Sequence, residues 1–141
     1  MENEIDEQYV SWLNNQAVTK HLETKKATLE SCREYVANHD TDHSQILWIV
    51  DEDKKIGTVT LSDIDFITKT AVVGIMIGDT NYWNKGYGST ALELISTYAR
   101  DKGLDILKAG ILHENIASIN CFKKAGFKIK RDVVTMEKKL C

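Results

Sequence analysis

The sequence predicts an α+β domain, of the mixed α/β kind, built on one mostly antiparallel sheet. Apolar runs on either side of a charged turn predict an antiparallel hairpin in the first half of the chain. Strand and helix alternate in the second half, which predicts a parallel crossover there. The 141 residues have room for one core, so residues 1–141 are expected to form a single domain. We expect about six strands and about four flanking helices.

Two helices precede the first strand in the predicted order. Apolar residues recur at helical spacing after an acidic start, which predicts a helix over residues 6–15. Thr28 is placed to cap a second helix, which ends near Asn38 and carries a glutamate in its first turn. The chain contains no proline, so no helix is interrupted from within, and Gly, Asn, Asp and Ser must supply the turns.

Three strands follow these helices. The β-branched and apolar runs Ile46–Val50 and Ile56–Leu61 are expected to pair as a hairpin around a polar turn. Residues 63–69 form the next predicted turn, and Thr70–Ile77 is the third strand. The continuous apolar character of this third strand predicts that it is buried on both faces of the sheet.

The second half alternates between helices and strands. Its strongest pattern is a helix from Gly88 to Lys102, which Gly103 ends. The side chains expected to face the core from this helix are Ala91, Leu92, Leu94, Ile95, Tyr98 and Ala99. The later elements are a strand over 105–112, a helix from Asn115 to Ala125 that Gly126 ends, and closing strands over 127–129 and 133–136.

Composition and charge narrow the function classes. The chain has 18 basic and 21 acidic residues, a net charge of −3 and no dense Lys/Arg block, so a nucleic-acid partner has little support. The apolar runs are far shorter than the ~20 residues that span a bilayer, and the acidic N-terminus lacks the pattern of a secretion signal. We therefore expect a cytoplasmic protein with no membrane partner. Cys32, Cys121 and Cys141 are widely spaced, which favours reduced thiols over a disulfide framework or a metal cluster.

A glycine turn, Gly86-Tyr87-Gly88-Ser89-Thr90-Ala91, stands before the strongest helix. It matches the G-x-G-x-x-G/A pattern of dinucleotide-binding folds, but seven residues separate Gly78 from Gly86, which argues against that fold. Glycines at a helix N-terminus still let backbone N–H groups approach an anion, and Lys85 adds a positive charge. The turn therefore predicts a pyrophosphate site. The alternative is a glycine pair that only permits close packing of strand and helix.

Four short motifs resemble those of one enzyme superfamily. They are Ile75-Met76-Ile77-Gly78, Tyr82-Trp83-Asn84-Lys85-Gly86-Tyr87-Gly88, Asn115-Ile116-Ala117-Ser118 and Phe122-Lys123-Lys124-Ala125-Gly126-Phe127. In this order and spacing they resemble the GCN5-related N-acetyltransferase (GNAT) superfamily, over residues 8–137. The early segment Tyr9-Val10-Ser11-Trp12-Leu13-Asn14-Asn15 is similar to the branch that holds ribosomal-protein N-terminal and amino-sugar acetyltransferases. Relatives begin with an extra edge strand, for which residues 1–5 leave little room.

The resemblance implies that acetyl-CoA is the co-substrate. Backbone amides of the turn would bind its pyrophosphate, the turn residues being Lys85, Gly86, Tyr87, Gly88, Ser89 and Thr90. The pantetheine arm would enter a wedge between two strands and meet Ile75, Met76, Ile77, Asn115 and Ser118. A bulge near Met76 or Ile77 would free one amide as the oxyanion donor. Trp83 stands where relatives carry Arg or Gln.

The resemblance defines the catalytic side chains less well. Val72 stands where many relatives carry a glutamate base, and Phe122 where many carry a tyrosine that protonates the thiolate. The remaining candidates for the base are Asp63, Asp65, Asp79, His113 and Glu114. Among these, His113 is favoured because imidazole titrates near ~6.5, with Glu114 beside it. Tyr82 is the candidate proton donor, with Tyr87 and solvent as alternatives.

Together these features predict an N-acetyltransferase that moves an acetyl group from acetyl-CoA to a primary amine, by direct attack in a ternary complex. Aromatic and polar residues of the first two helices favour a small acceptor, such as an amino sugar or a nucleotide-linked amino sugar. One alternative is a protein N-terminal acetyltransferase. Another is a CoA-binding module without turnover, because Val72 and Phe122 replace the usual base and acid. A homodimer is compatible with each of these functions.

Overall fold

The structure, a computed structural model, describes residues 4–15, 27–111, 115–129 and 135–140. In chain order its elements are α1 (Glu7–Asn14), α3 (Leu29–Asn38), β1 (Gln45–Asp51), β2 (Lys54–Asp65), β3 (Thr70–Ile77), the 3₁₀ helix η2 (Thr80–Tyr82), α4 (Tyr87–Asp101), β4 (Ile106–Gly110), α5 (Ile116–Lys124), β5 (Lys128–Ile129) and β6 (Thr135–Lys139). Within the described ranges one sheet has the strand order β1-β2-β3-β4-β6-β5, and β5 contributes only two residues. The predicted mixed α+β architecture is confirmed.

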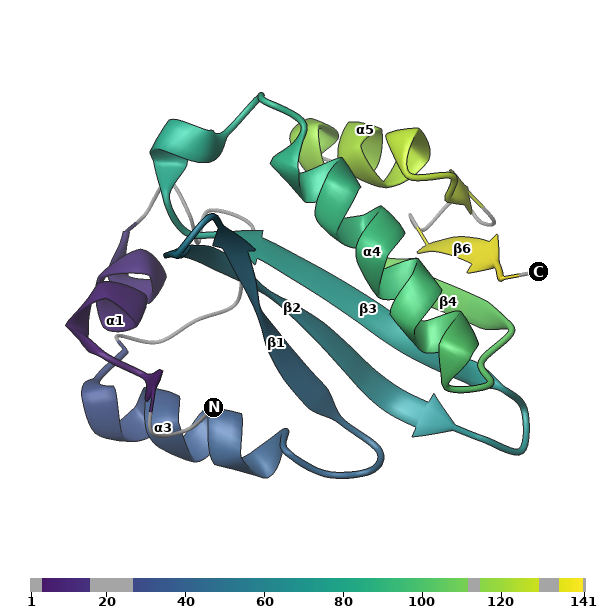
Figure 1. Ribbon diagram of the computed structural model, residues 1–141, viewed down its shortest axis with the longest axis horizontal. Coiled ribbons are helices and arrows are strands. Elements are labelled where there is room, and N and C mark those ends of the chain that lie inside the picture. Colours follow the sequence, from purple (N-terminus) through teal and green to yellow (C-terminus); the bar gives the residue numbers. More distant parts are fainter. Residues whose placement is uncertain (1–3, 16–26, 112–114, 130–134, 141) are drawn as a thin grey trace.

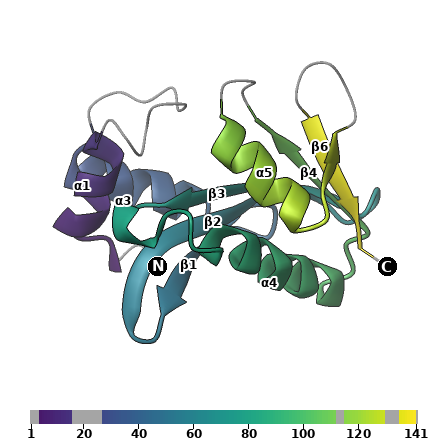
Figure 2. The same ribbon diagram turned by 90° about the horizontal axis from the view of Figure 1, so that it is seen from above.

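The sheet changes from antiparallel to parallel at its centre (Figure 1). β1, β2 and β3 form an antiparallel meander, whereas β4 runs parallel to β3 and antiparallel to β6. Helix α4 makes the crossover between the parallel pair, as the alternation of helix and strand predicts. Figure 2 shows α4 on one face of the sheet and α1 with α3 on the other.

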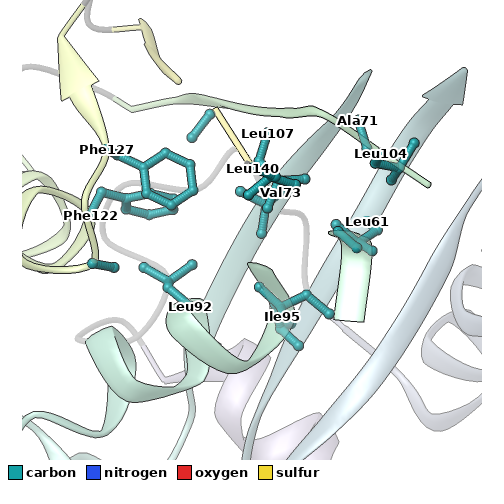
Figure 3. Packing of buried hydrophobic residues seen from close by; sticks show 14 of the residues in the cluster. Leu61, Ala71, Val73, Leu92, Ile95, Leu104, Leu107, Phe122, Phe127 and Leu140 are labelled. Carbon is teal, nitrogen blue, oxygen red and sulfur yellow. The ribbon is translucent and has the colours of Figure 1, made fainter. Parts of the chain in front are cut away.

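Two apolar clusters hold these layers together. The larger one joins α4 and α5 to the sheet, with Leu92 and Ile95 packing toward Leu61, Val73 and their neighbours (Figure 3). The smaller one joins α1 and α3 to β1, and it reaches β3 at Met76. Burying a large aliphatic side chain contributes about 1.5–3 kcal/mol, so these clusters fix the sheet against both helical layers.

Local signals in the sequence place several helix ends correctly. The Thr28 hydroxyl accepts a hydrogen bond from the Ser31 amide, and the Ser31 hydroxyl in turn bonds the Thr28 amide, which caps α3 at the predicted residue. Asn115 caps α5 through the Ser118 amide. Gly103, just beyond the end of α4, has φ +95°, the left-handed conformation that glycine adopts without strain.

Two expectations about burial are wrong. Leu94 is 67% exposed, because it lies about 200° around the helix axis from Leu92 and so points away from the sheet. β3 is not buried on both faces: Ala71 is buried, whereas Val72 is only half-buried. The second cluster reaches β3 at Met76 and leaves the Val72 end of that face less covered.

Some strand ends also differ from the prediction. β2 continues to Asp65, so the turn before β3 is shorter than the expected 63–69. A register shift between Ser62 and Asp65 lets the strand continue past the expected turn. β4 stops at Gly110 and the last strand spans Thr135–Lys139, both displaced from the predicted bounds.

The described N-terminal residues lead directly into a helix. None of the described residues 4–15 joins the sheet, and the chain enters α1 at Glu7. Among the helices described here, none has both the length and the apolar character that crossing a bilayer requires.

Candidate active site

β3 and β4 pair over a short stretch and then part. Their parallel pairing runs from Thr70 with Ile106 to Val72 with Lys108. β3 continues to Ile77, while β4 follows β6 instead. The result is a wedge in the sheet with Val72 at its apex, and one edge of the wedge is the later part of β3.

Backbone hydrogen bonds show which β3 groups face the wedge. The Gly78 amide donates to the Ile56 carbonyl on β2 at 2.8 Å. Successive residues of an antiparallel strand direct their backbone groups to opposite sides, so Ile77 and Ile75 turn theirs away from β2. In agreement, the Ile77 carbonyl accepts a hydrogen bond from the Trp83 indole at 2.8 Å, outside the β2–β3 ladder. The wedge edge therefore presents the amides of Ile75 and Ile77.

The expected bulge near Met76 is wrong. Met76 pairs with Thr58 in a register that runs without a shift from Gly57–Ile77 to Ser62–Val72. The alternation turns the Met76 backbone toward β2, so its amide is engaged in the sheet. The Ile77 amide faces the wedge without any bulge, because an edge strand whose neighbour has parted already exposes every second amide.

The glycine turn forms the N-terminus of α4 next to the end of β3. Gly86 has φ +86° and ends the turn in the left-handed conformation, with no side-chain cap on the helix. The first amides of an α-helix have no acceptor within the helix, so the amides of Tyr87, Gly88 and Ser89 converge at this end. The buried Ser89 hydroxyl donates back to the Gly86 carbonyl at 3.1 Å and holds the turn. This arrangement matches the predicted anion site.

Gly88 is required for the close approach of three elements. A Cβ at this position would lie 2.7 Å from the Cys121 sulfur of α5 and 3.8 Å from the Ile75 side chain of β3. The turn therefore sits directly against the wedge and the start of α4 against α5. Burial raises the pKa of the Cys121 thiol, which agrees with its expected role as a small packed side chain rather than a nucleophile.

Lys124 is a residue that the sequence analysis did not single out. Its ammonium lies 3.8 Å from the point that a Cβ of Gly86 would occupy. The last turn of α5 thus brings a positive charge to the turn, in addition to Lys85. The signal was available in the spacing, since Lys124 follows Cys121 by three residues and shares its helix face.

The two tyrosines of the turn lie away from the wedge. Tyr87 donates a hydrogen bond to the Asp51 carboxylate at 3.3 Å, and the Tyr82 ring packs edge-on against Tyr87 at 4.9 Å. Desolvation and the Asp51 charge raise the pKa of Tyr82. Asp51 ends β1, which is separated from β3 by β2. The structure therefore does not bring the candidate proton donor Tyr82 to the strands between which a thiolate would leave.

The candidate bases that the structure describes do not meet at the wedge. Asp65 pairs with Thr70, and a strand that continues for seven more residues places Ile77 about 23 Å away. Asp63 lies on β2 between Asp65 and Ser62, which pairs with Val72, so about 16 Å of strand still separates its position from Ile77. Asp79 is close to Ile77 in sequence, but it forms an ion pair with Lys54 at 2.9 Å. The hydrogen bond from Lys54 lowers the pKa of Asp79. His113 and Glu114 lie outside the described residues.

The remaining predicted residues fall at the start of α5 and in the core. Asn115 uses its side-chain oxygen to accept the Ser118 amide at 3.2 Å, so both residues lie at the N-terminus of α5. Phe122, which the resemblance aligns with a tyrosine of relatives, is 2% exposed, and its ring packs edge-on against Phe127 with centroids 4.9 Å apart. Its replacement of tyrosine is thus accommodated as a core contact.

Comparison with known proteins agrees with this geometry. A family model described as an acetyltransferase (GNAT) domain matches residues 1–128. No curated protein matches the sequence.

Solved structures share the fold at low sequence identity. A domain from Methanocaldococcus jannaschii has a TM-score of 0.80 and 24% identity, covering 99% of this chain and 94% of that chain. Spermidine N-acetyltransferase from Vibrio cholerae, solved with CoA and spermine, gives 0.81 at 17% identity, with 93% and 87% covered. Aminoglycoside acetyltransferase AAC(6')-Ib, solved with coenzyme A, gives 0.86 at 14% identity, with 99% and 91% covered. With a family match over nearly the whole chain, and with the wedge and glycine turn in place, the chain belongs to the GNAT acetyltransferase family.

Proposed function

We propose that this protein transfers an acetyl group from acetyl-CoA to a primary amine of a small acceptor. The observation that carries the proposal is the position of the α4 N-terminus, which has no side-chain cap. It lies directly beside the part of β3 that continues beyond its pairing with β4. The first binds an anion through backbone amides, and the second accepts an extended chain through its free backbone groups. A pyrophosphate joined to a pantetheine arm carries both features in one molecule.

The residues of this chain fit such a co-substrate. Because Gly88 has no side chain, the turn can pack directly against Cys121 and Ile75. Lys124 adds a positive charge beside Gly86. Asn115 keeps a side-chain amide N–H₂ group for the arm while its oxygen caps α5.

Acetyl-CoA, when bound, supplies an activated acetyl thioester for attack by the amine. In this proposal the Ile77 amide stabilises the negative charge that develops on the thioester oxygen, since it faces the wedge and is held by the sheet. His113 and Glu114 are the proposed proton acceptors for the amine. The thiolate takes its proton from solvent, because a thiol of pKa ~8.5 is a tolerable leaving group.

The acceptor class is proposed to be a small polyamine or amino sugar. The structural neighbours solved with spermine or with aminoglycosides support this class by fold similarity alone. A protein N-terminus remains a second candidate, from the motif similarity of residues 9–15. A CoA-binding module without turnover is a third, because Val72 and Phe122 occupy the positions of the usual base and acid.

A screen of acceptors tests the proposal. Thiol release from acetyl-CoA is followed with polyamines, aminoglycosides, amino sugars and short peptides, and each acetylated product is identified by mass spectrometry. Acetylation of a small amine supports the proposed function, whereas acetylation confined to peptides supports the second candidate. CoA binding by calorimetry without any acetylated product would reject the transferase and favour the third.

A further inference from the structure

Trp83 connects the pyrophosphate turn to the end of β3. Its indole N–H donates to the Ile77 carbonyl at 2.8 Å, and its own backbone N–H donates to the Thr80 carbonyl at 3.2 Å. Trp83 precedes Gly86 by three residues, so the side chain spans from the turn back to the strand. Trp83 as a whole residue is 37% exposed, which is unlike a core anchor.

The peptide that Trp83 contacts is held from both sides. The carbonyl of the Ile77–Gly78 peptide accepts from Trp83, and the amide of the same peptide donates to the Ile56 carbonyl at 2.8 Å. Without the indole, the Ile77 carbonyl would face the wedge with no partner from the turn. A peptide held at only one of its two groups can rotate about the strand axis, and the adjacent Ile77 amide would move with it.

Apart from the close packing of Gly88 against Ile75, the side-chain contacts that join this loop to the sheet lie toward β1 and β2. Asp79 pairs with Lys54, and its carboxylate also accepts the Asn81 amide at 3.0 Å. Tyr87 reaches Asp51 at 3.3 Å. These contacts fasten the loop to the hairpin, whereas Trp83 fastens it to the wedge edge of β3.

We infer that Trp83 is a positioning residue, which sets the spacing between the pyrophosphate turn and the Ile77 amide. The inference rests on the proposed binding of acetyl-CoA and goes beyond it. A long co-substrate held at its pyrophosphate places its thioester correctly only if the two binding points keep a fixed separation. A side chain that joins both points supplies that separation.

The test compares a whole co-substrate with a part of it. Dissociation constants are measured by calorimetry for CoA and for ADP, which carries the pyrophosphate and no pantetheine arm. Trp83→Phe keeps an aromatic ring and removes the N–H. Trp48→Phe is the matched control, because that indole lies on β1 and packs edge-on against Tyr9 and Trp12. Trp83→His retains a ring N–H, and thermal unfolding is recorded for every variant.

For Trp83→Phe we expect CoA affinity to fall about three- to tenfold, the range that loss of one hydrogen bond produces, with ADP affinity nearly unchanged. Trp83→His should recover part of the loss, and Trp48→Phe should change neither constant. Unchanged CoA affinity in Trp83→Phe overturns the inference. So does an equal loss for CoA and ADP, which would assign Trp83 to the turn alone. Equilibrium binding needs no acceptor, so an acceptor screen that fails rejects the transferase without affecting this result.

Discussion

Replacing Gly86 by aspartate should weaken CoA binding through charge. The Cβ would sit 3.8 Å from the Lys124 ammonium. The new carboxylate would therefore compete with the pyrophosphate for the positive charge of Lys124, and it would also repel the pyrophosphate directly. Two unit charges about 8 Å apart at an effective dielectric constant of about 20 repel by about 2 kcal/mol. This corresponds to about a thirtyfold increase in Kd.

The matched control is Gly86→Asn, because both variants place the same backbone strain on a residue with φ +86°. Asn and Asp tolerate this left-handed conformation better than other residues, and its cost is about 1 kcal/mol for either. Calorimetry should therefore show the thirtyfold gap between Asp and Asn, while their melting temperatures agree. Raising the salt from 0.15 to 1 M shortens the Debye length from about 8 to about 3 Å and should narrow the gap. Equal CoA affinity in the two variants would refute the placement of the pyrophosphate at this turn.

Three further changes test other parts of the fold. Gly78→Ala places a Cβ against the Trp12 ring in a space too small for it, so urea unfolding should show a loss of about 1–3 kcal/mol in the free energy of unfolding; wild-type stability would contradict this packing. The folded-state pKa of Asp79 is lowered mainly by Lys54, so this pair stabilises the protein above the unfolded pKa of ~3.9 and loses its effect as the pH falls through the lower folded value. Between pH 6 and 3 the melting temperature should fall further in the wild type than in Lys54→Met, and parallel curves would reject the pair. Leu94→Lys should change stability by no more than about 0.5 kcal/mol, and a larger loss would mean that Leu94 is covered.

The parts of the fold set by local patterns are predictable from the sequence. Thr28 and Asn115 cap their helices through hydrogen bonds to residues three positions later, which the residue types and spacing indicate. The apolar run Thr70–Ile77 forms a strand with the predicted ends. The end of β2 is not predictable in this way, because a register shift against β3 carries it to Asp65. Such a shift depends on the partner strand and leaves no local signal.

The same distinction between local signals and contacts with distant elements applies to the candidate site. The turn around Gly86 could be located because glycine at a helix start has a direct conformational consequence. The hydrogen bond from Trp83 to Ile77 could not be predicted in this way, because nothing in the local sequence indicates that the Ile77 carbonyl is available as an acceptor. Tyr82 illustrates the converse problem. Its place in the turn suggested access to the thiolate, but the approach of Asp51 from β1 draws the turn's tyrosines to the other side.

Two carboxylates of the described residues, Asp65 and Asp79, can be judged as proton acceptors by their pKa values and positions. A base that takes a proton from an amine works best when its pKa lies near the working pH. Backbone hydrogen bonds from Thr68 and Ile67 lower the pKa of Asp65, which also lies far from the wedge. Asp79 is near enough, but Lys54 lowers its pKa too. Both carboxylates are therefore weak bases that hold turns in place, and neither is suited to remove the proton of the amine.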